Sequence, residues 1–198
     1  MIWSWNLTIG VLFMRLFIAI NLKEDIKDYL LEIINLFREN TSRGNFTESN
    51  NLHLTLNFIG ETDKKDLPLL EEAMKHSVEN TGIKPFLLTT GKIGRFARRE
   101  GDIYWLGVLK EENLWTLQKE LVKQLKHRGF PVEDREYKPH LTLGRKVEVK
   151  RDFHISEVNE QLPARQMEVT KISLMKSERI GGKLVYTEIY SQPFLGNI

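Results

Sequence analysis

The sequence predicts an α+β fold with mainly antiparallel sheets, built from two pseudo-symmetric lobes that share a central cleft. Strands and amphipathic helices follow one another in the order β-α-β-α-β-β-α-β-β-β, with hairpins, which favours this class over a doubly wound parallel fold. The string HLTL occurs at residues 53–56 and again at 140–143. A pair of lobes carrying one copy each would bring the two copies together across the cleft.

The composition fits one folded domain. Hydrophobic residues make up 41% of the 198 residues and charged residues 28%, as in ordinary globular proteins. The apolar N-terminus lacks a positive start and a cleavage site, and Asn6 and Thr8 interrupt it, so we expect neither a signal peptide nor a membrane span. We expect residues 1–13 to be an extension, disordered or a product of start-site choice, and residues 14–198 to be the single bilobal domain.

Cysteine is absent and the net charge is only +2. Disulfides, thiol catalysis and cysteine–zinc sites are therefore excluded, and the composition fits a cytoplasmic location. Since the overall field is weak, phosphate would have to be bound by a local cluster of cations. The candidates fall in two groups along the sequence, Lys92, Arg95, Arg98 and Arg99, then Arg135, Lys138, Arg145 and Lys146.

The first elements are a strand, a helix and a loop. Residues 15–20 (RLFIAI) form a strand by composition. Asn21 and Glu24 match a capping box, and apolar residues recur at helical spacing up to about residue 40. The polar segment 41–51 predicts a loop that leads into the first HLTL strand.

The middle of the chain predicts a second helix and a hairpin. Thr62 or Asp63 caps the helix, and the Thr81-Gly82 pair ends it. A strand at residues 86–90 follows, then a long Gly- and Arg-rich loop at 91–102 and a strong strand at 103–109.

The last third predicts one more helix and three strands. Leucines at helical spacing mark a helix that ends near Arg128-Gly129. A charged connection leads to the second HLTL strand, which begins after Pro139 because proline cannot donate a ladder hydrogen bond. Residues 167–175 and 183–190 are two strands joined by a glycine turn.

Each HLTL strand is expected to have two different faces. Alternate residues of a strand share a face, so the leucines pack on helices while each histidine and threonine point the other way. The apolar face would carry Leu52, Leu54, Leu56 and Phe58 in the first copy, with His53, Thr55 and Asn57 opposite; in the second, Leu141 and Leu143 oppose His140 and Thr142. Strict alternation sends Arg145 to the leucine face, unless a bulge at Gly144 turns it.

Two histidines that face one pocket form an acid–base pair. One removes a proton from a nucleophile and the other protonates a leaving group, since histidine titrates near neutral pH. Threonine hydroxyls beside them are uncharged donors suited to phosphate oxygens. The four side chains of His53, Thr55, His140 and Thr142 therefore indicate phosphodiester cleavage without a metal.

Other uses of these residues stay open. A strand histidine is more often structural or solvated than catalytic. Zinc would need a third protein ligand, for which Asp102, Glu133, Asp134 and His76 have no diagnostic spacing. His76, His127 and His154 fit surface positions, and Phe96 or Trp105 could stack on a base. The glycines at 91, 94 and 101 match no Walker or Rossmann pattern.

Five blocks in order resemble a known family. MRLFIAI, HLTLNFIGE, GKIGRF with IYWLGV, YKPHLTLGR and ISLMKSERIGGKLVYTEIY are similar to LigT-like RNA 2′,3′-cyclic phosphodiesterases of the two-histidine phosphoesterase superfamily. The resemblance runs from Met14 to about Pro193. It implies a bilobal α+β fold with helices outside and a sheet from each lobe in the cleft. It also implies hydrolysis of 2′,3′-cyclic phosphate to a 2′-phosphomonoester, the reverse of which gave the name 2′-5′ RNA ligase.

The resemblance also implies roles for residues. His53 would be the proton donor to the departing 3′ oxygen and His140 the proton acceptor from water, with Thr55 and Thr142 holding the phosphate. Arg145 and Tyr137 would bind substrate. We expect RNA or a nucleotide with a 2′,3′-cyclic phosphate as partner, no cofactor, metal or membrane, and a monomer. The alternative is a non-catalytic RNA-end or phosphate-binding protein, which would more naturally use arginine and lysine.

Overall fold

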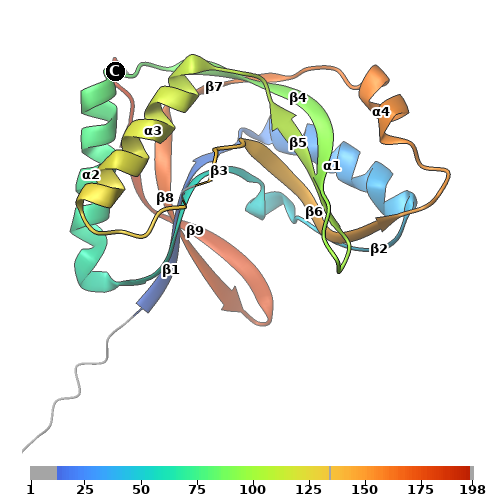
Figure 1. Ribbon diagram of the computed structural model, residues 1–198, viewed down its shortest axis with the longest axis horizontal. Coiled ribbons are helices and arrows are strands. Elements are labelled where there is room, and N and C mark those ends of the chain that lie inside the picture. The colour runs from blue at the N-terminus through green and yellow to red at the C-terminus, as the bar shows by residue number, and fades with distance from the viewer. Residues whose placement is uncertain (1–12, 134, 197–198) are drawn as a thin grey trace, which may run out of the picture.

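The computed structural model describes residues 13–133 and 135–196. They form one curled nine-stranded sheet with helices on its outer side (Figure 1). The strands are β1 Phe13–Asn21, β2 Thr41–Phe46, β3 His53–Asp63, β4 Phe86–Phe96, β5 Asp102–Val108, β6 His140–Val149, β7 Gln166–Val169, β8 Lys171–Ile180 and β9 Lys183–Pro193. The helices are α1 Glu24–Glu39, α2 Leu67–Thr81, α3 Glu112–His127 and α4 Ile155–Gln161, with 3₁₀ turns at Ser49–Asn51 and Lys64–Asp66. The predicted α+β class is confirmed.

The sheet consists of two half-sheets that meet at β3 and β6. Its strand order is β7-β4-β5-β6-β3-β1-β8-β9, and β2 pairs with β6. We call β3, β1, β8 and β9 the first half-sheet, and β2 with β4 to β7 the second. Only one pair of residues, Leu54 and Leu141, joins β3 to β6 in register, so each half-sheet curls on its own side of this junction.

Each half-sheet has its own helices. Helices α2 and α3 pack on each other and contact β9 and β3, whereas α1 contacts β2 and β6, and α4 contacts β4 (Figure 1). In α1, the buried Ile26, Leu30, Ile33 and Phe37 follow the predicted helical spacing. The same holds for the fully buried Leu114, Leu117, Leu121 and Leu125 of α3.

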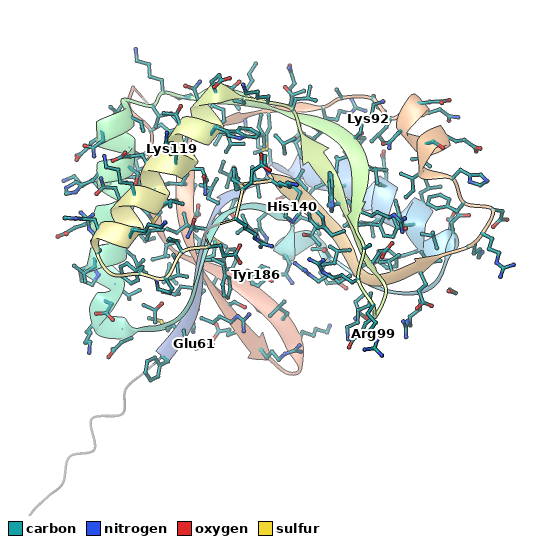
Figure 2. The ribbon with its side chains drawn as sticks, viewed as in Figure 1. Glu61, Lys92, Arg99, Lys119, His140 and Tyr186 are labelled. Atoms are coloured by element: carbon teal, nitrogen blue, oxygen red, sulfur yellow. The ribbon has the colours of Figure 1, made fainter. Side chains whose placement is uncertain are left out.

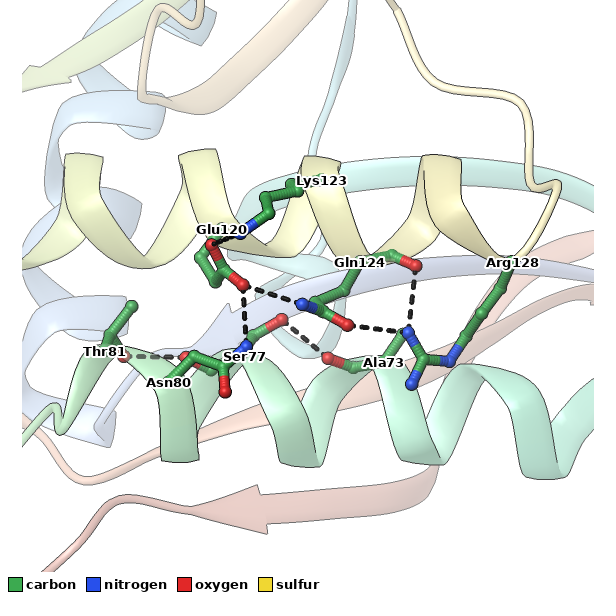
Figure 3. A network of polar contacts seen from close by, with 8 residues as sticks. All are labelled: Ala73, Ser77, Asn80, Thr81, Glu120, Lys123, Gln124 and Arg128. Carbon is green, nitrogen blue, oxygen red and sulfur yellow. Dashed lines mark hydrogen bonds and ion pairs between the residues drawn. The ribbon is translucent and has the colours of Figure 1, made fainter.

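Polar contacts link α2 to α3 (Figure 3). The Glu120 carboxylate accepts hydrogen bonds from Asn80 at 2.9 Å and from Gln124 at 2.7 Å. Arg128 donates to the side-chain oxygen of Gln124 at 2.7 Å and to Nδ1 of His76 at 2.7 Å. His76 was expected at the surface, but it is half-buried and holds this helix pair together.

Several element ends follow the predicted signals. The Asp63 carboxylate accepts from the backbone of Lys65 and caps the 3₁₀ turn before α2, whereas α2 itself, predicted to be capped by Thr62 or Asp63, begins after Asp66, which makes no side-chain cap. Gly82 ends α2 with φ of +63°, the left-handed conformation that favours glycine. The predicted capping box of α1 is wrong: the helix starts at Glu24 after Lys23, which makes no side-chain cap.

Three predicted segments need correction. The expected loop at 41–51 contains β2, because its polar residues pair with β6 as a strand without a buried side chain. The expected loop at 91–102 is mostly hairpin: β4 continues to Phe96 and β5 starts at Asp102. The expected strand at 167–175 is two strands, β7 at one edge of the sheet and β8 in the other half, between β1 and β9.

The N-terminal prediction lies largely outside the described residues. The expected extension covered residues 1–13, and of these only Phe13 is described. It opens β1 and pairs with Asp63 of β3, so the strand starts two residues before the predicted strand at 15–20 and includes the last residue of the expected extension. No helix in the described part of the chain is long and apolar enough to cross a membrane.

Candidate active site

The two HLTL segments lie side by side at the junction of the half-sheets. Leu54 of β3 is the antiparallel partner of Leu141 of β6, and both are 0% exposed. Continuing this register by one residue in each direction sets His53 opposite Thr142 and His140 opposite Thr55. All four are half-buried and lie on the face away from the leucines. A local two-fold axis therefore relates the two copies, as the repeat predicted.

Backbone carbonyls fix the tautomer of both imidazoles. Nδ1 of His53 lies 2.7 Å from the carbonyl oxygen of Asn51, and Nδ1 of His140 lies 2.7 Å from that of Lys138. A carbonyl only accepts, so each Nδ1 carries the hydrogen and each Nε2 presents a lone pair. The hydroxyl of Thr55 donates to Nε2 of His53 at 2.9 Å.

The carbonyl groups of the two HLTL threonines each accept a hydrogen bond from a side-chain hydroxyl. Tyr137 donates its hydroxyl to the carbonyl of Thr55 at 3.1 Å, and Thr47 donates to that of Thr142 at 2.8 Å. Because β3 and β6 are joined by one residue pair, the neighbouring carbonyl groups lack a strand partner, and these two hydroxyls bind them instead. The substrate contact predicted for Tyr137 stays a prediction, since its hydroxyl is bonded to β3 here. Thr47 was missed because nothing in a polar segment marks one threonine as a partner of a strand 95 residues away.

A β-bulge interrupts each HLTL strand just after its threonine. On β3, Thr55 pairs with Ala19 and Asn57 with Ile18, which leaves Leu56 as the inserted residue. Both Leu56 and Asn57 are then buried, and the next residue changes face. The predicted faces of Asn57 and Phe58 are therefore wrong: Asn57 is 7% exposed, and Phe58, at 41%, lies on the histidine side.

The bulge on β6 has the same form. Thr142 pairs with Trp105 and Gly144 with Tyr104, so Leu143 is inserted. This turns Arg145 onto the histidine face, where it is exposed. A bulge at Gly144 was the condition under which the sequence would place Arg145 on the histidine face. The structure has this bulge one residue earlier, at Leu143. By the two-fold relation, Arg145 occupies the place that Phe58 has on β3.

The site disfavours the charged form of both histidines. The pKa values of His53 and His140 are lowered, first by burial, and the backbone hydrogen bonds offset this in part. The positive charge of Arg145 lowers the pKa of both imidazoles further. Arg145 is therefore within electrostatic reach of the two histidines at once, in a position to receive an anion bound between them.

Each histidine packs against aromatic rings of its own half-sheet. The ring of His53 is 4.8 Å from Phe17 and 5.3 Å from Tyr186, and that of His140 is 5.2 Å from Phe96 and 6.1 Å from Trp105. Figure 2 labels His140 and Tyr186 near the junction of the half-sheets. These rings limit rotation of the imidazoles and exclude water from one side, which accounts for the burial that lowers their pKa values.

Comparison with known proteins agrees with this geometry. The family model of the 2′-5′ RNA ligase superfamily matches residues 32–181, which include both HLTL strands. This chain belongs to the 2′-5′ RNA ligase superfamily. The resemblance to LigT-like phosphodiesterases, drawn above from five sequence blocks, is thereby confirmed.

Individual relatives cover most of the chain. A Thermotoga maritima protein named RNA 2′,3′-cyclic phosphodiesterase is 35% identical over 133 residues, 67% of this chain and 70% of its own length. A protein of that name from Methanothermobacter thermautotrophicus is 30% identical over 179 residues, 88% of this chain and 96% of the relative. The crystal structure of E. coli LigT with 3′-AMP matches 93% of this chain and 99% of its own, with a TM-score of 0.74 at 24% identity. That likeness shows the fold.

Most of the lysine and arginine side chains that the sequence suggested for phosphate binding, Arg145 apart, are paired with carboxylate or carbonyl groups. Arg95 forms an ion pair with Asp102 at 2.5 Å, and Lys146 with Glu100 at 2.6 Å. Lys92 donates to a backbone carbonyl of α4. The remaining pairs are Arg135 with Glu133 and Lys138 with Glu136. Arg98 and Arg99 lie in the turn between β4 and β5, and Figure 2 labels Arg99 at its tip.

The side chains considered for a zinc site do not converge on the histidine pair. Asp102 binds Arg95, Glu133 binds Arg135, and His76 binds Arg128 between α2 and α3. Asp134 lies outside the described residues. Within residues 13–133 and 135–196, no group of three His, Asp or Glu side chains is arranged to hold a metal ion.

Proposed function

We propose that this protein hydrolyses the 2′,3′-cyclic phosphate ends of RNA or nucleotides to 2′-phosphomonoesters, without a metal cofactor. The observation that carries the proposal is the paired presentation of two Nε2 atoms. His53 and His140 have the same tautomer, fixed by the same kind of carbonyl contact, and lie on one face beside Thr55 and Thr142. The names of the relatives supply the substrate class.

The reaction has two proton transfers, one at each histidine. Nε2 of neutral His140 removes a proton from water as the water oxygen attacks phosphorus. The bond from phosphorus to the 3′ oxygen breaks, and protonated His53 gives its Nε2 proton to that oxygen. The product carries the phosphate on the 2′ oxygen, and the proton gained by His140 returns to His53 through solvent.

Phosphate binding adjusts both pKa values in the useful direction. In the free protein, burial and Arg145 lower the pKa of both histidines. A bound phosphate anion offsets the charge of Arg145, which allows His53 to be protonated. Threonine hydroxyls donate to the non-bridging oxygens, which develop charge in the transition state. Thr55 is already aligned on the same face, since it donates to Nε2 of His53.

The same arrangement supports 2′-5′ ligation. A 5′ hydroxyl group can replace water as the nucleophile: His140 removes its proton as its oxygen attacks phosphorus, and His53 protonates the 3′ oxygen as the bond from phosphorus to that oxygen breaks. The product would then be a 2′-5′ phosphodiester. We propose this as a secondary reaction, favoured when a 5′-hydroxyl end occupies the place of water.

Product identification by phosphorus NMR tests this function. The purified protein is incubated with adenosine 2′,3′-cyclic phosphate in excess EDTA. We expect one new signal, that of the 2′-phosphate, at the same rate with and without chelator. A 3′-phosphate product, or activity that EDTA abolishes, would contradict the proposal. Salt-sensitive RNA binding with no product would instead identify a passive RNA-end binding protein.

A further inference from the structure

Tyr186 differs from the other four tyrosines in the use of its hydroxyl. Tyr29 donates to the carbonyl of Pro163, Tyr137 to that of Thr55, and Tyr190 to the side chain of Gln192, while Tyr104 interacts with Arg95. Among the residues that the structure describes, the Tyr186 hydroxyl has no such partner. In the described part of the chain, Nε1 of Trp105 is the one fully buried side-chain polar atom that lacks a hydrogen-bond partner. The Tyr186 hydroxyl also lacks a partner, so it must be accessible to solvent.

The ring of Tyr186 is held firmly beside His53. It meets the imidazole edge-on, with 5.3 Å between the ring centres and 86° between the planes. It also meets Phe17 at 4.9 Å and 70°. Two edge contacts fix the ring, so its free hydroxyl has a defined position on the histidine face.

The positive charges of two arginines act on this hydroxyl. Burial raises the pKa of Tyr186, and the charges of Arg145 and Arg15 lower it. Arg145 comes from β6 and Arg15 from β1, so positive charges from both half-sheets act on this one neutral donor. A neutral O–H near two cations is arranged to bind an anion, such as the phosphate expected between the histidines.

The ring that meets His140 edge-on carries no hydroxyl. Phe96 meets His140 edge-on at 5.2 Å and 88°, almost the same geometry as that of Tyr186 and His53. Phe96 lies on β4 and Tyr186 on β9, so the two rings are not related by the strand order, but they meet the two histidines in nearly the same way and only Tyr186 brings a hydroxyl. A donor present on one side only can distinguish the two faces of a bound phosphate.

We propose that Tyr186 is a substrate-contacting residue whose hydroxyl donates a hydrogen bond to one non-bridging oxygen of the phosphate, on the side of His53. The proposal rests on the proposed function, because the phosphate is that of the cyclic diester. It assigns to Tyr186 the discrimination between the two non-bridging oxygens, which the symmetric His and Thr pairs do not provide.

The test compares Tyr186→Phe with Tyr190→Phe. Tyr186→Phe keeps both edge contacts and removes only the oxygen. We expect kcat/KM for the cyclic nucleotide to fall about 10- to 100-fold, the usual effect of losing a hydrogen bond to a charged group. Tyr190→Phe removes a hydroxyl from the same strand, away from the histidines, and should stay within about twofold of the wild type.

A second measurement uses the two diastereomers of the cyclic phosphorothioate, in which sulfur replaces one non-bridging oxygen or the other. We expect the wild type to prefer one diastereomer, and Tyr186→Phe to lose most of that preference. The ratio is measured within one protein, so a lower folded fraction cancels. An active wild type with an unchanged rate and ratio in Tyr186→Phe would overturn this inference and leave the proposed function standing. An inactive wild type would overturn both.

Discussion

Leu54 and Leu141 are antiparallel partners at the only rung between β3 and β6. This one pairing brings together two strings that are 87 residues apart, since 141 − 54 = 87. It sets each histidine opposite the threonine of the other copy and puts both bulges at equivalent places. The close placement of the two histidines is thus a consequence of strand register, and separating them would require breaking the junction.

Removing the charge of Arg145 should raise the pKa of both histidines. Its positive charge now opposes protonation of His53 and His140, so Arg145→Gln removes that opposition while burial remains. Both limbs of the bell-shaped kcat/KM profile should therefore move to higher pH. The maximum should also fall about 10- to 100-fold, because a charged contact to phosphate is lost.

Lys146→Asn is the matched control for this effect. Lys146 is the next cation on β6, but it pairs with Glu100 and has φ of +54°, which asparagine tolerates. Its profile should keep the wild-type limbs. NMR titration of the two imidazoles gives the same comparison without turnover. Unmoved pKa values in Arg145→Gln would contradict the placement of that charge.

The roles of the histidines can be separated with a better leaving group. A substrate with sulfur in place of the bridging 3′ oxygen releases a thiolate, whose conjugate acid has a pKa of about 8.5 and needs little protonation. His53→Ala should regain most of its lost rate on this substrate, whereas His140→Ala should stay impaired. Recovery in His140→Ala but not in His53→Ala would show that His140 is the acid and His53 the base.

Tyr137 and Thr47 should contribute similar stability from equivalent positions. Each donates a hydroxyl to the carbonyl of a site threonine, at 3.1 Å and 2.8 Å. Tyr137→Phe and Thr47→Val should each lower the free energy of unfolding by about 1 kcal/mol. Urea unfolding with an unchanged slope measures this. No loss in either variant would mean that water replaces both hydroxyls at no cost.

Gly94 should tolerate no side chain. A Cβ there would overlap the ring of Trp105, which packs beside His140. Gly94→Ala should therefore cost about 1–3 kcal/mol of unfolding free energy and reduce activity through a displaced indole. Gly91→Ala on the same strand is the control, since its nearest neighbour is the flexible Leu109 side chain at 3.3 Å. Equal effects at both positions would contradict this account.

The sequence predicted the parts of the site that depend on short-range pattern. Alternation in HLTL separated histidine from leucine, because two-residue periodicity holds over four residues of strand. It failed from Asn57 onward, where the inserted Leu56 reverses the faces. The bulge on β3 that reverses the face of Phe58 has an equivalent on β6, which turns Arg145 toward the histidines. A bulge is decided by the neighbouring strand, which the local sequence does not contain.

Several contacts between residues far apart in the sequence were also not predicted. The segment 41–51 has no apolar periodicity, so its pairing with β6 was not predictable, nor was the hydroxyl of Thr47. The glycines at 91 and 94 suggested a loop, but Gly94 is needed in a strand to admit the Trp105 ring. Tyr186 was noticed only as part of a family block, since its relation to His53 depends on packing across β1, β8 and β9.

The most direct test of the central claim is kcat/KM for adenosine 2′,3′-cyclic phosphate in His53→Ala and His140→Ala, with His127→Ala as control. His127 is exposed at the end of α3, and its variant should match the wild type. We predict that each site variant loses about 10²- to 10⁴-fold, the usual contribution of a general acid or base. Full activity in either one would contradict the two-histidine mechanism.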